Sequence, residues 1–364
     1  MIYFFFSLFY FILFGVLAFS KVNDKQFYKL LYVIVVLFWG CSYTYAPDLS
    51  GYMEYFYREV KTLSQGIDLR AHGFEEGFNV FAALSKSLIS EYIFFQILLF
   101  ATEMCLVLSG IRKILSGKQA RVASVLLFFI YPCMLSATRQ GMAIALIIYA
   151  IPFIQKGNYK KYFGLLIVAF LFHHSSAIAI PLYFVRYLDK LSNSNKFCIG
   201  VLLIADICWI FGLSLSEYLD NALAIFLADA NDFEKYSIYM NDEETSISNY
   251  GIAKLLEINI AYIGFVLYSQ KGNNNLLKVI LLLYTIIGLM LGGILAHRFL
   301  YYFIILYYVC MFIGVNALVN KEHPKTFLPI SYVILSAYMF WFYIIKNEFI
   351  EKTYHFLPTG FQIY

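Results

Sequence analysis

Residues 122–155 read VASVLLFFIYPCMLSATRQGMAIALIIYAIPFIQ, and Arg139 is the one charged side chain among these 34 residues. A transmembrane helix needs about 20 apolar residues, so the stretch is long for one crossing and short for two. It predicts a hairpin of two short helices, 122–137 and 141–155, joined at Thr138–Arg139–Gln140. An arginine at the centre of such a helix costs about 2.5–3.5 kcal/mol unless it is partnered or hydrated. Arg139 is therefore either an interfacial anchor or an anion-binding group.

The composition extends this pattern to the whole chain. Of 364 residues, 61% are hydrophobic and 14% are charged, against roughly 45–50% and 25% in soluble domains, which excludes a cytosolic enzyme. The net charge of +4 is not clustered, which excludes a nucleic-acid binder. The sequence predicts an all-α polytopic membrane protein, 1–364 as a single membrane domain, with about 10–12 transmembrane helices that include short or broken ones. The apolar runs are 3–19, 28–45, 92–111, 122–137, 141–155, 162–185, 197–213, 252–269, 279–296, 299–319 and 327–345.

Charge in the loops predicts the orientation. Alternate loops hold 17 of the 27 Lys and Arg residues but only three of the 23 acidic residues, and the positive-inside rule places these loops in the cytoplasm. They are 21–29, 112–121, 156–161, 186–196, 271–278 and 321–325. Two long segments then face outward: 46–91, which includes an amphipathic stretch at 77–88, and the acidic segment 214–251.

The run 162–185 does not fit one crossing. It lies between two basic loops, and its 24 residues are too few for two full helices. We expect two half-helices that meet at His173–His174–Ser175–Ser176, a geometry that is tolerated where it lines a cavity. Adjacent residues on a helix point about 100° apart, so the two histidines are poorly placed to chelate a metal. They are either structural groups or one of them is a general base near neutral pH.

Other polar residues are also candidates. Arg298, beside His297, stands between two apolar runs and is an interface anchor or a second anion-binding group; two arginines on one face suit a pyrophosphate. Asp48, Glu75 and Glu76 are outer-segment acids that are either solvated or functional. The chain has no HExxH, GxSxG or phosphate-binding glycine loop, so we expect no metal and no cofactor.

Four short motifs, in order, resemble those of the EpsG family, relatives of the Wzy polymerases that build bacterial exopolysaccharide, capsule and O-antigen. Arg139–Gln140–Gly141–Met142–Ala143 resembles the family's Arg-Gln-x-hydrophobic-Ala signature, and Phe172–Ala177 is similar to its His-x-Ser-Ala segment, which singles out His174 over His173. Asp48 with Tyr52 matches its Asp-x-x-x-Tyr, and Glu75–Phe78 matches its Glu-x-Gly-aromatic. Arg298 before Tyr301–Tyr302 fits a second family arginine.

The resemblance implies an integral-membrane glycosyltransferase in the bacterial cytoplasmic membrane, with a fold similar to that of GT-C-type enzymes and its active site facing the periplasm or exterior. The donor would be a growing glycan on undecaprenyl pyrophosphate and the acceptor one lipid-linked repeat unit, joined with inversion and without a metal. His174 is the implied base, with Glu75 and His173 as rivals. The implied substrate-binding residues are Arg139, Arg298, Gln140, Asp48, Tyr52, Glu76 and His297. A chain-length regulator and a flippase are implied partners, besides the lipid bilayer.

Two alternatives stay open on the sequence. A flippase of lipid-linked oligosaccharides also uses broken helices and buried charges, although no internal repeat is visible and the candidate polar groups gather on the outer side. A ligase that transfers a finished O-antigen would use the same arginines and histidines. The length of the product separates a polymerase from a ligase.

Overall fold

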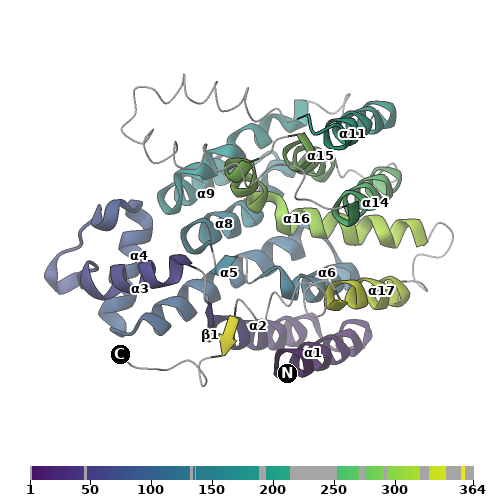
Figure 1. The fold of residues 1–364 in the computed structure, drawn as a ribbon. Helices are drawn as coiled ribbons and strands as arrows, with labels where there is room; N and C mark the ends of the chain where they lie inside the picture. The colour runs from purple at the N-terminus through teal and green to yellow at the C-terminus, as the bar shows by residue number, and fades with distance from the viewer. Residues whose placement is uncertain are drawn as a thin grey trace. The chain divides into compact units, whose positions relative to one another are not determined.

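In a computed structural model of the chain, the described residues are 2–44, 47–131, 134, 135, 137–187, 194–213, 252–269, 275–290, 293–319, 328–341 and 354–356. They form helices almost throughout, which confirms the predicted all-α polytopic class (Figure 1). One antiparallel pair of short strands, β1 (Ser42–Thr44) and β2 (Tyr354–Phe356), is the β-structure of the described part. The chain divides into two compact units, 1–180 with 328–364, and 181–327. The prediction of a single membrane domain stays a prediction.

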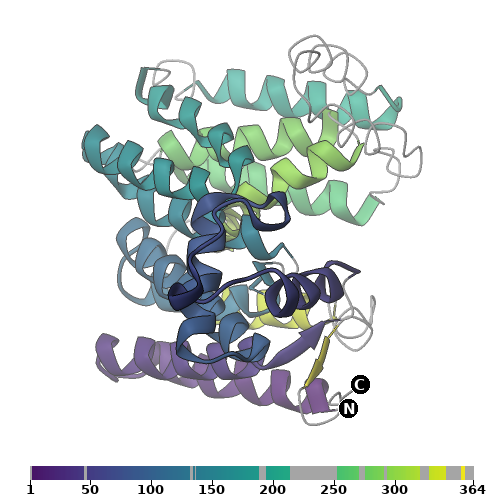
Figure 2. The ribbon, with the colours of Figure 1, turned by 90° about the vertical axis from the view of Figure 1, so that its left-hand side faces the viewer.

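The helices of the first unit come mainly from the N-terminal half of the chain. Strands β1 and β2 also belong to this unit, and Figure 2 shows them side by side. The helices are α1 (Ile2–Phe19), α2 (Asp24–Gly40), α3 (Pro47–Arg58), α4 (Glu76–Leu88), α5 (Tyr92–Ile114), α6 (Gly117–Leu126), α8 (Thr138–Gln155), α9 (Tyr159–Phe172) and α17 (Leu328–Phe340), with the short 3-10 turns η1 (Leu63–Gln65), η2 (Ala71–Gly73) and η3 (Leu127–Phe129) and the first half of the 3-10 segment η4 (His174–Tyr187).

The first unit packs around α5 and α8. Helix α5 contacts α2, α4, α6 and α8, and α8 also contacts α9. An aromatic cluster fills the space between α1, α2 and the turn η3: the ring of Phe128 lies 4.0 Å from that of Tyr10 and 5.1 Å from that of Trp39. Aromatic packing of this kind uses the high aromatic content of the chain to build the interior.

The second unit contains α11 (Asn195–Ile210), α14 (Ile252–Ser269), α15 (Asn275–Met290) and α16 (Gly293–Val319). Helices α14 and α16 approach closely where Gly264 meets Gly314, because a Cβ atom on Gly264 would lie 2.6 Å from the carbonyl oxygen of Gly314. Small residues allow such close approach between helices in membranes. The outward segment 214–251 lies outside the described residues.

The expected break near His173 is present. Helix α9 ends at Phe172, and His173 is extended, with φ −161° and ψ 117°. The chain then folds back, because the hydroxyl of Tyr162 near the start of α9 donates a hydrogen bond to the carbonyl oxygen of Ala179 at 2.5 Å. Ala179 follows Tyr162 by 17 positions, so a straight helical continuation would place these two residues roughly 28 Å apart.

Two details differ from the sequence-based expectation. The helix expected at 122–137 begins earlier, as α6 at Gly117, and ends at Leu126, where the short turn η3 follows it. Proline lacks a backbone donor and disfavours helical geometry in the residue before it, so Pro132 argues against one unbroken helix over 122–137. Helix α3 was not expected, whereas the amphipathic stretch near 77–88 forms α4 as anticipated.

Exposed apolar faces support membrane association. On α1 the large side chains of Phe5, Phe9, Ile12 and Val16 are all exposed, at the spacing of one helix face. A stripe of this kind on α11 includes Leu203, Ile207 and Ile210. Among the described helices, α5 alone is long and apolar enough to cross a bilayer by length and composition, so the number of crossings stays a prediction.

Candidate functional site

The carboxylate of Glu75 joins two of the candidate residues. Its Oε2 atom accepts a hydrogen bond from Nη1 of Arg139 at 2.5 Å, and its Oε1 atom lies 2.7 Å from Nδ1 of His173. Glu75 is buried, with 6% of its side chain exposed, while Arg139 and His173 keep 24% and 19% exposed. A charge-assisted pair of this geometry is stronger than a neutral hydrogen bond.

Three helix ends hold these side chains. Glu75 precedes α4 in an extended conformation, and its carboxylate makes no capping bond to that helix, so it is available to Arg139 and His173. Arg139 lies in the first turn of α8, and His173 follows the last residue of α9. Because these three helix ends meet, side chains that are far apart in the sequence come into contact.

Arg139 has two further partners. Its Nε atom donates to the hydroxyl oxygen of Tyr52 on α3 at 3.2 Å, and its guanidinium carbon lies 4.2 Å from the centre of the Phe74 ring. The latter contact is a cation–π interaction, which also restricts the plane of the guanidinium. Arg139 is therefore fixed by an acid, a hydroxyl and an aromatic face.

The segment that carries Glu75 is itself braced. Asn79, one turn into α4, donates to the carbonyl oxygens of Leu69 and Phe74 at 2.9 and 3.0 Å and accepts from the hydroxyl of Tyr55 at 2.5 Å. Asn79 is buried, and these three hydrogen bonds use both of its N–H donors and its oxygen, as a buried amide requires. The result is a fixed turn at Phe74–Glu75.

Helix α4 also lies directly against the end of α9. A Cβ atom on Gly77 would lie 2.8 Å from the carbonyl oxygen of Leu171, closer than ordinary van der Waals contact. Glycine at this position allows the backbone of α4 to approach α9. The approach sets the distance between Glu75 and His173.

The surroundings of Glu75 favour its charged form. Burial by itself raises the pKa of the carboxyl group, but the hydrogen bond with His173 and the positive charge of Arg139 outweigh it and lower the pKa from 4.5 to about 2. Glu75 is thus ionised at neutral pH and a weak base. Its arrangement suits an orienting role toward His173 and Arg139.

The two histidines differ in their surroundings. His174 is exposed, and its ring lies 4.6 Å from that of Phe170. Its backbone N–H points to Oε1 of Glu75 at 3.4 Å, while the ring of His173 makes the direct contact to that oxygen. The preference for His174 as the base stays a prediction, but the geometry favours His173.

The structure thus brings together Tyr52, Glu75, Arg139 and His173, which we call the Glu75 cluster. Gln140 is buried beside Arg139, and Glu76 is half-buried in the first turn of α4. Asp48 lies on α3 four residues before Tyr52, and its side chain lies outside the described residues, as do those of His297 and Arg298 on α16 of the second unit.

Sequence reasoning missed two residues of this site. Phe74 could not be singled out from the sequence, because aromatic residues are 20% of the chain and one beside a glutamate is not distinctive. Asn79 could have been found as a polar residue on the apolar side of the amphipathic stretch. Glu103 on α5, an acid inside the apolar run 92–111, is 1% exposed, and neither carboxylate oxygen has a hydrogen-bond partner within the described part.

Comparison with protein families assigns the chain. The family model described as the EpsG family matches residues 25–358. The chain belongs to the EpsG family. Searches of curated proteins and of solved structures gave no significant match, so the likeness to GT-C-type folds stays a prediction.

Membership of the EpsG family supports a general role like that of Wzy-type polysaccharide polymerases, in polysaccharide biosynthesis and at a membrane. Each of the four EpsG-like motifs contributes to the region of the Glu75 cluster, through Tyr52, Glu75, Arg139 and the histidine pair. Within the described ranges no group of three or more His, Cys, Asp or Glu side chains could hold a metal ion. The absence of a metal requirement stays a prediction.

Proposed function

We propose that the protein polymerises oligosaccharide repeat units linked to undecaprenyl pyrophosphate, by inverting glycosyl transfer on the outer face of the bacterial cytoplasmic membrane. The growing glycan is the donor, and a single lipid-linked unit is the acceptor. The contact of Glu75 with both Arg139 and His173 carries this proposal, because it places a base and an anion-binding group side by side.

His173 is the base in this mechanism. When its Nδ1–H donates to the carboxylate of Glu75, the neutral imidazole has its lone pair on Nε2. Glu75 fixes this tautomer and stabilises the imidazolium that forms when Nε2 takes a proton, as the acid of a nucleophile–histidine–acid triad does. Its ionised state suits this role.

Arg139 serves the leaving group. In the transfer step an acceptor hydroxyl oxygen bonds to the anomeric carbon of the donor and its proton passes to Nε2 of His173. The bond from that carbon to the pyrophosphate oxygen breaks, and its electron pair stays on undecaprenyl pyrophosphate. A guanidinium that is fixed before the reaction stabilises this developing charge without reorganisation. Arg298 stays a predicted second cation for the pyrophosphate, because two arginines suit a group with two negative charges.

The test uses purified protein in nanodiscs with a synthetic undecaprenyl-pyrophosphate repeat unit, no nucleotide and excess chelator. Arg139→Ala is compared with the wild type and with Arg58→Ala, which removes an exposed arginine of α3 that pairs only with Glu54 among the described residues. We expect a ladder of longer lipid-linked glycans from the wild type and Arg58→Ala, and elongation slowed by about 10²–10³-fold in Arg139→Ala. A ladder of equal rate in Arg139→Ala contradicts the mechanism.

Other products point to other functions. A single transfer to an acceptor without further growth indicates a ligase. No elongation, together with transbilayer movement of the lipid-linked unit in proteoliposomes, indicates a transporter and removes the roles given to Arg139 and His173.

A further inference from the structure

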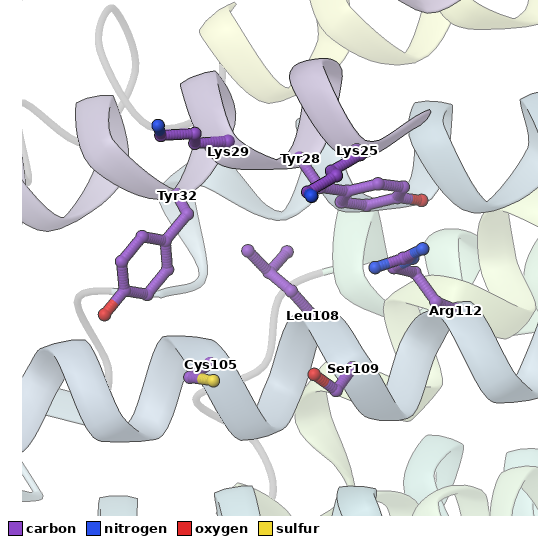
Figure 3. A pocket seen from close by; sticks show the side chains of 8 residues that line it. All are labelled: Lys25, Tyr28, Lys29, Tyr32, Cys105, Leu108, Ser109 and Arg112. Carbon is purple, nitrogen blue, oxygen red and sulfur yellow. The ribbon is translucent and has the colours of Figure 1, made fainter. Parts of the chain in front are cut away.

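A second polar site lies in the first unit, between α2 and α5. An open pocket of about 430 Å³ lies between the two helices. Its polar lining consists of Lys25, Tyr28, Lys29 and Tyr32 from α2, and Ser109 and Arg112 from α5. Figure 3 shows side chains of both helices pointing into the space between them. We call it the α2–α5 pocket.

The charge of the α2–α5 pocket is positive. Two lysines and an arginine line it, and no acidic residue does. Asp24, the acid next to Lys25, pairs instead with Arg121 of α6, whose Nε atom donates to it at 2.6 Å. The three cations of the pocket therefore have no lining carboxylate to balance them, which favours an anion.

Aromatic contact fixes one of the cations. The guanidinium carbon of Arg112 lies 4.5 Å from the centre of the Tyr28 ring, so the planar group is held at the wall of the pocket. The next residue, Lys113, points to a different partner, with Nζ 3.6 Å from the centre of the Tyr149 ring. Arg112 is thus the α5 cation directed to the pocket.

The pocket lies at one end of α5. Arg112 is in the last turn of that helix, 20 residues after Tyr92, which corresponds to about 30 Å along the axis. Tyr92, at the other end, packs against Phe56 of α3 with ring centres 5.8 Å apart, in the segment that carries the Glu75 cluster. The loops with Lys25, Lys29 and Arg112 are those predicted to face the cytoplasm.

An apolar stripe continues from the basic end along α2. Leu30, Val33 and Leu37 are 41%, 41% and 55% exposed, and they lie on the helix face next to that of Lys29. Cations beside an exposed apolar stripe match a molecule with an anionic head and an acyl chain. Basic pockets between transmembrane helices on the cytoplasmic side recognise such headgroups.

We propose that the α2–α5 pocket binds the phosphate headgroup of an anionic membrane phospholipid. Lys25, Lys29 and Arg112 pair with the phosphate, the hydroxyl of Ser109 adds a hydrogen bond, and the acyl chains lie along Leu30, Val33 and Leu37. The site is separate from the Glu75 cluster and independent of the function proposed for it.

The binding test uses phosphatidylglycerol as the probe and phosphatidylcholine as the neutral comparison. The variant Lys25→Gln/Lys29→Gln/Arg112→Gln removes the three cations. The control Lys21→Gln/Lys118→Gln/Lys160→Gln removes three exposed lysines that also lie in predicted cytoplasmic loops but do not line the pocket. Native mass spectrometry of the detergent-solubilised protein counts bound lipid during titration. We expect phosphatidylglycerol to bind the pocket variant roughly 100-fold more weakly than the wild type, with the control unchanged.

A second measurement does not depend on the folding of a variant. Cys105 is exposed and lines the α2–α5 pocket, so its maleimide labelling in the wild type, followed by peptide mass spectrometry, reports occupancy. We expect labelling to be slower in phosphatidylglycerol vesicles than in phosphatidylcholine vesicles. Equal labelling in both vesicles, or equal loss of lipid binding in the control variant, overturns the proposal. Protection of Cys105 by inorganic phosphate alone, without anionic lipid, assigns the site to a soluble phosphate and overturns the lipid assignment.

Discussion

At the scale of single residues, the two adjacent histidines should differ in their contribution to the reaction. His173 contacts Glu75 through its ring, whereas the ring of His174 is exposed beside Phe170. We expect His173→Gln to slow elongation by about 10²–10⁴-fold, the usual contribution of a general base, and His174→Gln to slow it far less. Single-turnover elongation in nanodiscs measures both. The reverse order would return the base to His174.

The pH dependence of stability should report the charge of Glu75. Its pKa is lowered from 4.5 to about 2, so the ionised carboxylate is more stable in the folded protein than in the unfolded chain. The shift corresponds to a contribution of about 3 kcal/mol to the free energy of unfolding. This contribution is fully present above the pKa of the unfolded chain and is lost as the pH falls from about 4.5 to about 2. Thermal unfolding in detergent should show Glu75→Gln less stable than the wild type near neutral pH, with the difference shrinking in that window. Glu76→Gln is the control, and a difference for Glu75→Gln that is constant down to about pH 3 argues against the ion pair.

Some residues of the site could be predicted from the sequence because charged side chains are rare in its apolar runs. Arg139 stands alone in a long apolar stretch, and a charge there is costly enough to need a reason. The contacts of Glu75 with Arg139 and His173 could not be predicted from the sequence. The two residues are 64 and 98 positions away from Glu75, and the contacts depend on how three helix ends meet. Phe74 was not visible either, since its role arises only from the position of the Arg139 guanidinium.

At the scale of helices, the contact between α4 and α9 should control the site. A Cβ atom at Gly77 would meet the backbone of Leu171 at 2.8 Å, whereas Gly164, within α9, has nothing within 4 Å. We expect Gly77→Ala to push the helices apart, to destabilise the protein by about 1–3 kcal/mol and to weaken elongation by separating Glu75 from His173. Gly164→Ala should be neutral or stabilising by about 0.5–1 kcal/mol. Thermal unfolding and elongation measure both, and equal behaviour of the two variants would show that the close approach is unimportant.

Length arithmetic predicted the broken element at His173, because the run 162–185 fits neither one crossing nor two. The fold-back itself is recorded by the bond from Tyr162 to Ala179. Helix α3 was missed for the opposite reason. It lies in a polar outer segment that has no apolar run. Its Tyr55 and Phe56 rings pack against aromatic rings on α4 and α5, respectively. Tertiary packing decides helices of this kind.

At the scale of the whole molecule, the asymmetry of loop charge should set the orientation in the membrane. Ser64 lies in the predicted outer segment, and Lys118 and Lys160 lie in predicted cytoplasmic loops; all three are exposed. We expect a membrane-impermeant thiol reagent to label Ser64→Cys in intact cells, and to label Lys118→Cys and Lys160→Cys only after the membrane is opened. The same prediction places the Glu75 cluster outside and the α2–α5 pocket inside.

Asn193→Cys extends this experiment to the broken element. Position 193 lies outside the described residues, in the basic loop 186–196, which begins at the end of η4. The hydrogen bond between α9 and η4 returns the chain to the side from which α9 began. We therefore expect position 193 to be labelled, like Lys160→Cys, only after the membrane is opened. Labelling from outside in intact cells would mean that 162–185 crosses the membrane once. That result would place Arg186, Lys190 and Lys196 outside, against the charge rule, and would leave the turn at His173 without a topological role.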